Sequence, residues 1–195
     1  MDIRGKLRDD IINGNAVLFL GAGVGMAAGL HGAKDLSKYL SDSAGNINAK
    51  DKVKTDFAKL VTLLDKDPQF TRDWVNQQLV EYFCEDSNYK NLKSHVELLQ
   101  TNWKAIFTTN YDLVIEKASQ KGLNHGKRLL PISNPKYQSS IYEDSPKKLK
   151  YFKIHGCIDD IDKRPNDSAP LVITQMDFVS SIKRNKPFWD ELERF

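Results

Sequence analysis

The sequence predicts an α/β fold in which a Rossmann-like parallel sheet carries helices on both faces, with a helical insertion between the first two strands. Three observations predict this fold. Compact apolar runs alternate with segments of helical periodicity. Three of these runs end in a short turn that contains Gly or Asn. A long stretch between the first two runs has helical periodicity only.

The first third of the sequence predicts one strand between helices. Apolar residues recur at helical spacing from Ile3 to the break at Asn13-Gly14-Asn15, and the apolar run 16–20 follows as the first strand. From about residue 33 to 104 we expect helices and no strand, because the apolar residues recur three and four positions apart.

Strand character returns at residues 105–109, and an apolar helix that ends near Gly122 follows. Residues 127–132 and 150–155 predict two more strands, separated by a polar loop. We expect a last short strand at 171–174 and helices from there to Phe195.

Composition favours one globular domain over residues 1–195, because 195 residues with 40% hydrophobic content can bury a sizeable core. The apolar helical stripe at the end of the sequence stops without a cap or a polar tail. We therefore expect these residues to be the N-terminal part of a longer protein.

Charge and cysteine content narrow the class of protein. The net charge of +3 is spread along the chain, which does not favour binding to nucleic acid or to a membrane. Cys84 and Cys157 are far apart and form no Cys-x-x-Cys pair, so we expect reduced thiols, no zinc module and a cytoplasmic location. No signal peptide and no apolar run of membrane-spanning length is recognisable.

The first turn is rich in small residues. Such a turn between strand and helix presents backbone N–H groups to which a pyrophosphate can bind. The alternative interpretation is a tight turn that only requires positive φ. A nicotinamide-dependent dehydrogenase is disfavoured, since no acidic residue follows about 20 positions later at a strand end. The residues of this candidate phosphate-binding turn are Gly21, Ala22, Gly23, Val24 and Gly25.

The second turn contains Thr109, Asn110 and Asp112. The amide of Asn110 both donates and accepts hydrogen bonds, which suits it to hold a ribose hydroxyl and a water molecule. Asp112 has two interpretations, a ligand contact and an N-cap of the helix that starts near Leu113, and both can hold if that helix faces the ligand.

The third turn contains His155 and Gly156. The imidazole titrates near neutral pH and can accept a proton from a hydroxyl or a water molecule. The alternative is a hydrogen-bonded structural histidine at a strand end. The acidic loop around Asp159, Asp160 and Asp162 lacks a metal-ligand pattern and predicts solvated surface.

Taken together, the three turns resemble the bacterial SIR2-like domains of the sirtuin superfamily. The family pattern Gly-Ala-Gly-Val/Ile, Thr-x-Asn-x-Asp and Lys-x-His-Gly corresponds here to residues 21–24, 108–112 and 153–156. The resemblance covers about residues 14–195, and it implies a Rossmann-like domain that binds NAD+.

Differences from the protein-deacylating sirtuins indicate which branch of the sirtuin superfamily the sequence resembles. Those enzymes carry a four-cysteine zinc module after His-Gly, a Ser where Gly25 stands and a Gln where Thr109 stands. The resemblance is therefore to the zinc-free branch found in antiphage defence effectors, which hydrolyse NAD+. It implies that NAD+ is the substrate and that no metal is needed, with Asn110 and His155 catalytic and residues 21–25, Thr109 and Asp112 binding NAD+.

Two alternatives to an NAD+ glycohydrolase stay open at this point. One is an NAD-dependent protein deacylase, which releases nicotinamide only as acylated peptide is consumed. The other is a non-catalytic module that binds NAD or ADP-ribose and supports oligomerisation. The resemblance also implies a homo-oligomer, or association with a partner ATPase, Argonaute or sensor domain.

Overall fold

The computed structural model describes residues 3–45, 51–135, 141, 145–163 and 170–195. Its centre is a sheet of four parallel strands in the order β1-β2-β4-β3. The predicted parallel α/β sheet is therefore confirmed. The strands are β1 (Val17–Leu20), β2 (Ala105–Thr108), β3 (Arg128–Ile132) and β4 (Lys148–Lys153).

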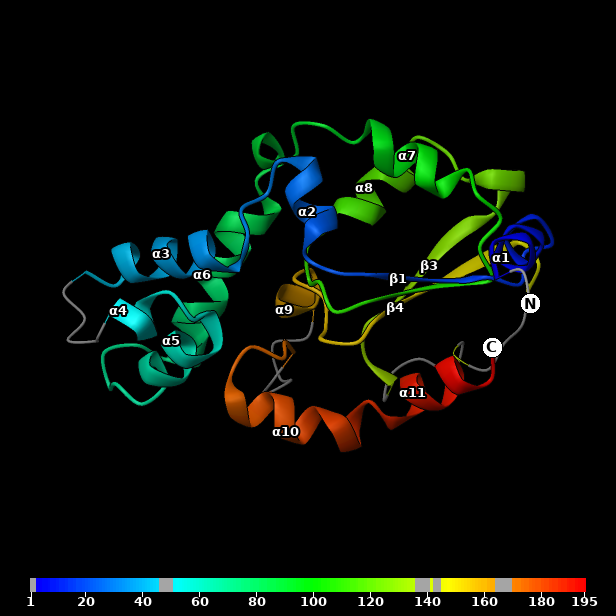
Figure 1. Ribbon diagram of the computed structural model, residues 1–195. Helices are drawn as coiled ribbons and strands as arrows, with labels where there is room; N and C mark the ends of the chain where they lie inside the picture. Colours follow the sequence, from blue (N-terminus) through cyan, green and yellow to red (C-terminus); the bar gives the residue numbers. More distant parts are fainter. Residues whose placement is uncertain (1–2, 46–50, 136–140, 142–144, 164–169) are drawn as a thin grey trace.

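Helices cover both faces of the sheet, as predicted (Figure 1). One face carries α2 (Gly23–Ala28), α7 (Lys93–Leu99) and α8 (Val114–Ser119), and the other carries α10 (Gln175–Arg184) and α11 (Lys186–Glu193). Side chains alternate between the two faces along each strand, so the core has one layer on each side of the sheet. Ile106 and Tyr151 pack under α8, whereas Phe107 and Phe152 stack at 4.5 Å on the face covered by α11.

The predicted helical insertion lies between β1 and β2 and forms a lobe beside the carboxyl ends of the strands (Figure 1). Side chains cap the first turn of two helices in this lobe: Asp56 accepts from Lys59 N, and Thr71 accepts from Trp74 N. The helices of the lobe are α3 (Ala33–Ser43), α4 (Asp51–Lys54), α5 (Phe57–Leu64), α6 (Arg72–Cys84) and the 3₁₀ turn η1 (Asp86–Asn88).

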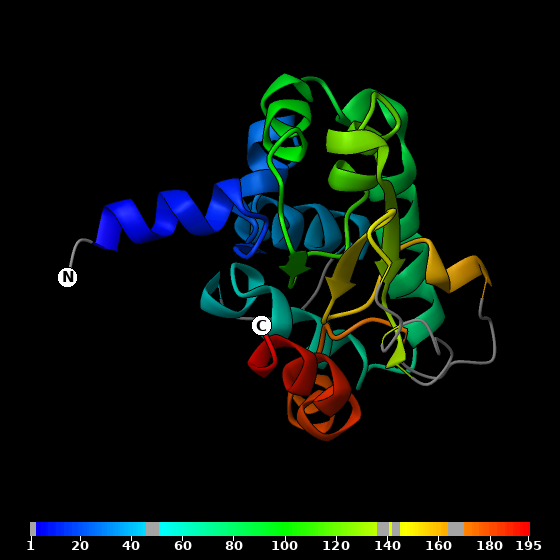
Figure 2. The same ribbon diagram turned by 90° about the vertical axis from the view of Figure 1, so that its right-hand side faces the viewer.

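The remaining short elements lie at the margins of the sheet. Helix α1 (Ile3–Ile12) extends away from the sheet, as Figure 2 shows. The 3₁₀ turn η2 (Asn124–Gly126) precedes β3, and α9 (Asp160–Lys163) follows β4. In the described part of the chain, every helix is too short or too polar to cross a membrane.

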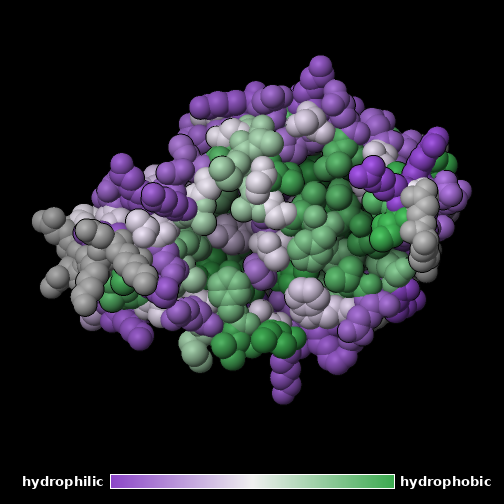
Figure 3. Space-filling model, in the orientation of Figure 1, coloured by the Kyte–Doolittle hydropathy of each residue, from purple (hydrophilic) through white to green (hydrophobic). Residues whose placement is uncertain are grey.

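Strand β1 forms one edge of the sheet, and its Phe19 side chain is 49% exposed. Figure 3 shows apolar side chains gathered over the region where β1 crosses the molecule in Figure 1.

The expected strand at 171–174 is wrong: these residues are buried but form no strand. Other groups bind the backbone atoms that a ladder would use. Arg72 donates to Leu171 O at 2.9 Å, and the Asp177 carboxylate accepts from the N–H groups of Ile173 and Thr174. Among the described residues, one backbone hydrogen bond joins the segment to the residues after β4, from Val172 N to His155 O. The segment is therefore held by a capping carboxylate rather than by a neighbouring strand.

Candidate functional site

The three turns meet at one edge of the sheet because their strands are neighbours in register. Leu20 pairs with Thr108, and Thr108 pairs with Lys153, so β1, β2 and β4 end side by side. Ligands of open parallel sheets bind outside such carboxyl ends.

A cleft of about 470 Å³ lies between this edge, the helical lobe and α10. Pockets of this size hold small-molecule ligands. Six of the predicted site residues line it, namely Ala22, Gly25, Thr109, Asn110, Asp112 and His155.

The Gly-rich turn is open on its outer side. Gly21, Ala22 and Gly23 are exposed, and no described atom lies within 4 Å of the place a Cβ would occupy on either glycine. Gly25 is different, because it is buried and a Cβ there would lie 3.1 Å from Asp112 Oδ2. Val24 packs into the core, and its carbonyl accepts from His95 Nε2 at 2.8 Å.

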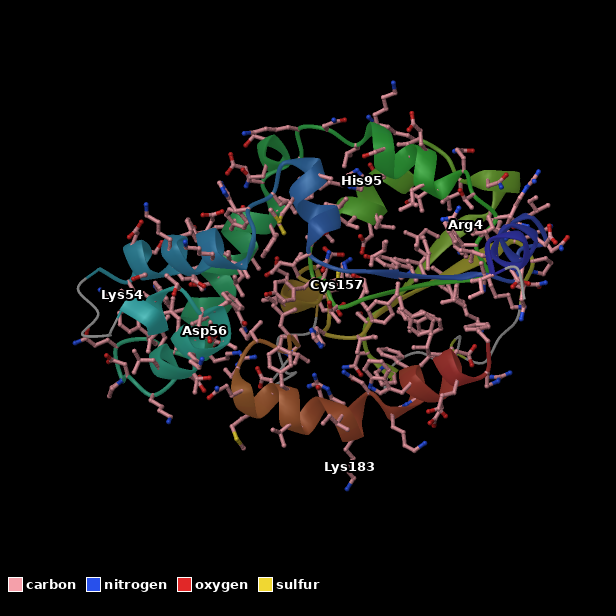
Figure 4. The ribbon with its side chains drawn as sticks, in the orientation of Figure 1. Arg4, Lys54, Asp56, His95, Cys157 and Lys183 are labelled. Atoms are coloured by element: carbon pink, nitrogen blue, oxygen red, sulfur yellow. The ribbon has the colours of Figure 1, made fainter. Side chains whose placement is uncertain are left out.

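His95 is a structural support that the sequence did not indicate. It is buried on α7 beside α2 (Figure 4), and it fixes the Gly-rich turn through the Val24 carbonyl. Since a carbonyl only accepts, Nε2 carries the proton in this contact.

Asn110 is fixed by both neighbouring turns. Its backbone N–H donates to Thr108 Oγ1 at 3.0 Å, and that hydroxyl donates to Leu20 O on β1. Its side-chain Nδ2 donates to Gly21 O at 3.0 Å, and the side chain also hydrogen-bonds the Asp112 carboxylate. The amide therefore connects the second turn to the Gly-rich turn at the mouth of the cleft.

His155 is half-buried, two residues beyond the end of β4. Its ring meets the Phe178 ring edge-on, at 5.1 Å and 89°, and hydrogen-bonds the Thr109 backbone. Burial, together with the positive charge of Arg184, lowers the pKa of His155 below its ordinary value, although the Thr109 bond acts in the opposite direction. The imidazole is therefore neutral at neutral pH and can accept a proton.

Asp112 lines the cleft and also accepts a hydrogen bond at the start of α8, where the N-cap residue is Leu113 rather than Asp112. Its Oδ1 accepts from Val114 N at 3.0 Å, at the start of α8. Burial raises its pKa, while Lys153, the Val114 N–H, His95 and Asn110 favour the charged form.

The far wall of the cleft comes from the helical lobe, which sequence reasoning did not connect with the site. Phe57 on α5 and Phe83 on α6 face Tyr111, with ring centroids 6.4 and 5.6 Å away. Asp56 lies beside them on the lobe (Figure 4). This wall is apolar and aromatic, and it faces the polar turns of the sheet edge.

The cysteines lie apart and the described acidic and imidazole groups are dispersed. Cys84 is exposed, whereas Cys157 is buried with its pKa raised by burial to about 11, which disfavours a thiolate. Among the described residues, no three His, Cys, Asp or Glu side chains lie close enough to hold a metal ion.

Comparisons with known proteins agree with this geometry. Residues 104–195 match the family model of the SIR2-like domain. The chain is 28% identical over 178 residues to the NAD(+) hydrolase ThsA of Enterococcus faecium, an alignment that covers 89% of this chain and 33% of that protein. The chain thus spans about a third of the length of this relative. The Rossmann-like parallel sheet and these matches agree with the resemblance to SIR2-like domains that the three motifs indicated.

Proposed function

We propose that this chain is an NAD+ glycohydrolase domain that cleaves NAD+ to nicotinamide and ADP-ribose and needs no metal. One observation carries the proposal: Asn110, His155 and the Gly-rich turn converge on the same cleft from strands that end in register. The similarity to the NAD(+) hydrolase ThsA of Enterococcus faecium supports it.

The Gly-rich turn binds the pyrophosphate of NAD+ in this proposal. Gly21, Ala22 and Gly23 leave their backbone open at the surface, which lets phosphate oxygens approach N–H groups. Val24 and Gly25 shape the turn from inside, by packing into the core and against Asp112.

Asn110 orients the ribose and the attacking water. Cleavage of the bond between ribose and nicotinamide develops positive charge on the ribose, so the water must be placed accurately as the bond breaks. The electron pair of the broken bond goes to the nicotinamide ring nitrogen, and the water oxygen forms the new bond to the ribose carbon. Asp112, bonded to Asn110, lies near the carboxamide or the ribose.

His155 acts as the base toward the attacking water or a ribose hydroxyl. Its neutral ring accepts the proton, and its bond to the Thr109 backbone sets the orientation of the ring. Phe178 packs edge-on against the ring and limits its rotation.

The biological setting is part of the same proposal. A SIR2-like domain without a zinc module resembles antiphage effectors that act in the cytoplasm, deplete NAD+ and cause abortive infection. Residues 1–195 would form the NAD-binding domain of such an effector, which works as a homo-oligomer or with a partner ATPase, Argonaute or sensor domain.

The test is chromatographic analysis of NAD+ incubated with the chain in the absence of acylated peptide. Nicotinamide and ADP-ribose should appear in equal amounts, and Asn110→Ala and His155→Ala should abolish them while leaving the fold intact. Asn102→Ala is the matched control, because Asn102 bonds Lys127 outside the cleft.

The alternatives give different results in this experiment. A deacylase would leave NAD+ intact until acylated peptide is added. A non-catalytic module would bind NAD+ and return it unchanged. Turnover at the wild-type rate by Asn110→Ala or His155→Ala would refute the catalytic assignment.

A further inference from the structure

Lys153 is a fully buried cation directly beneath the site, and the proposed reaction gives it no role. Its side chain is 0% exposed and lies between β4 and α8. The Nζ donates to Glu116 Oε1 at 2.7 Å and to the backbone carbonyl of Asp112, and it lies 5.5 Å from the centre of the Tyr151 ring.

Burying a lysine in place of an apolar side chain costs free energy of folding. Desolvation of an ammonium and a carboxylate often exceeds their mutual attraction, and replacing a buried pair by apolar residues is frequently neutral or stabilising. Burial favours neutral Lys153, but Glu116 and the other acidic groups around it outweigh burial and raise its pKa well above the ordinary value. The lysine is therefore charged, and the free energy of folding alone does not explain its presence.

The contacts of Lys153 connect the two catalytic turns. Lys153 lies two residues before His155, and the carbonyl that it binds belongs to Asp112, two residues after Asn110. Backbone hydrogen bonds on either side, Ile154 N to Thr108 O and Ile158 N to Tyr111 O, join the same two segments. The ammonium is a side-chain brace between them, in addition to the bond of the His155 ring to the Thr109 backbone.

We propose that Lys153, held in place by Glu116, is a positioning residue that fixes the 109–112 turn against the 153–156 turn, so that Asn110 and His155 face the same ribose. This proposal rests on the proposed function for the identity of the reaction. Glu116 lies on α8, four residues after Asp112, so the ion pair also ties α8 to β4.

The same strand contains a matched control. Lys150 points to the opposite face of the sheet, donates to Ile141 O at 2.7 Å and pairs with Glu191 at 2.9 Å. The two side chains of that pair are 7% and 2% exposed. It is also a buried lysine on a carboxylate and a backbone carbonyl, but it lines no part of the cleft.

The test compares Lys153→Met with Lys150→Met, because Met keeps the length of the side chain and removes the charge. Both variants should unfold at lower temperature, since each removes the lysine of a buried ion pair, although Glu191 keeps its bond to Arg194. Only Lys153→Met should lower kcat, by about 10- to 100-fold, with KM within about threefold of wild type, as expected when positioned groups shift by about 1 Å.

A second variant separates positioning from folding. Lys153→Met combined with Glu116→Leu removes both charges, so its unfolding temperature should recover toward wild type while kcat stays low. This variant also provides the test if Lys153→Met does not fold. Wild-type kcat in the folded double variant, or an equal loss of kcat in Lys150→Met, would overturn the positioning role.

The experiment can distinguish failure of the glycohydrolase proposal from failure of the positioning role of Lys153. If the wild-type chain binds ADP-ribose but leaves NAD+ intact, the glycohydrolase proposal fails. The ADP-ribose dissociation constant then tests Lys153 alone: weaker binding in the double variant than in Lys150→Met supports the brace, and equal binding in both refutes it.

Discussion

Gly156 follows His155 at a point where the chain has no room for a side chain. Its φ is +89°, and a Cβ there would lie 2.0 Å from the Pro170 carbonyl oxygen. Gly156→Ala therefore adds left-handed strain of about 1–2 kcal/mol. It also forces the 170–172 segment away from the turn, which breaks the 2.9 Å bond from Val172 N to His155 O, worth about 1 kcal/mol. The loss in the free energy of unfolding should be about 2–3 kcal/mol, or about 4–12 °C in Tm for a chain of this length.

The assay is thermal unfolding followed by circular dichroism, with Gly122→Ala as the control. Gly122 has a φ of +112°, but no described atom lies within 4 Å of the place its Cβ would occupy, so it reports strain without a clash. Gly122→Ala should lose only about 1–2 kcal/mol. Equal Tm values for the two variants would refute the close approach of Pro170 to the turn.

Two further predictions concern pH and the buried 171–174 segment. If neutral His155 is the base, kcat/KM for NAD+ should fall on acidification with an apparent pKa below about 6.5. Arg184→Gln should raise this apparent pKa, because it removes a positive charge that lowers the pKa of His155. A fall in kcat/KM centred above pH 7 would exclude His155 as the base. Asp177→Asn should reduce the free energy of unfolding at pH 7 by about 3 kcal/mol, because Asp177 pairs with Arg72 at 2.8 Å and accepts from Ile173 and Thr174. Burial alone would raise the pKa of Asp177, but these bonds lower it below its ordinary value. The contribution of Asp177 to the free energy of unfolding is therefore present above the pKa of the unfolded state and is lost as the pH falls through the pKa of the folded state. Denaturant unfolding of the wild type and of Asp177→Asn should differ at pH 7 and converge in strong acid.

The sheet and its three turns could be predicted because their signals are local. Each apolar run is followed at once by Gly or Asn, and parallel strands place those turns at one edge whatever the rest of the chain does. The strand predicted at 171–174 was wrong because that prediction also rested on a local signal alone. Its apolar content is strand-like, but Arg72, almost a hundred residues earlier, and Asp177 bind the backbone groups that a strand would need.

The supports of the site were missed because they depend on contacts between distant parts of the chain. Nothing near Phe57 or His95 in the sequence indicates that one faces the cleft and the other holds the Gly-rich turn. Lys153 had a usable signal, since a lysine inside the otherwise apolar run 151–154 must be buried with its neighbours and must therefore have a partner. Its partner Glu116 lies on the helix that follows the second turn.

Nicotinamide release from NAD+ without any acylated peptide, compared between the wild-type chain and Asn110→Ala, is the decisive measurement of glycohydrolase activity. Nicotinamide and ADP-ribose should accumulate together with the wild type, and Asn110→Ala, equally folded, should form neither. Equal release by both proteins, or NAD+ left unchanged by a wild type that binds it, would refute the proposed activity.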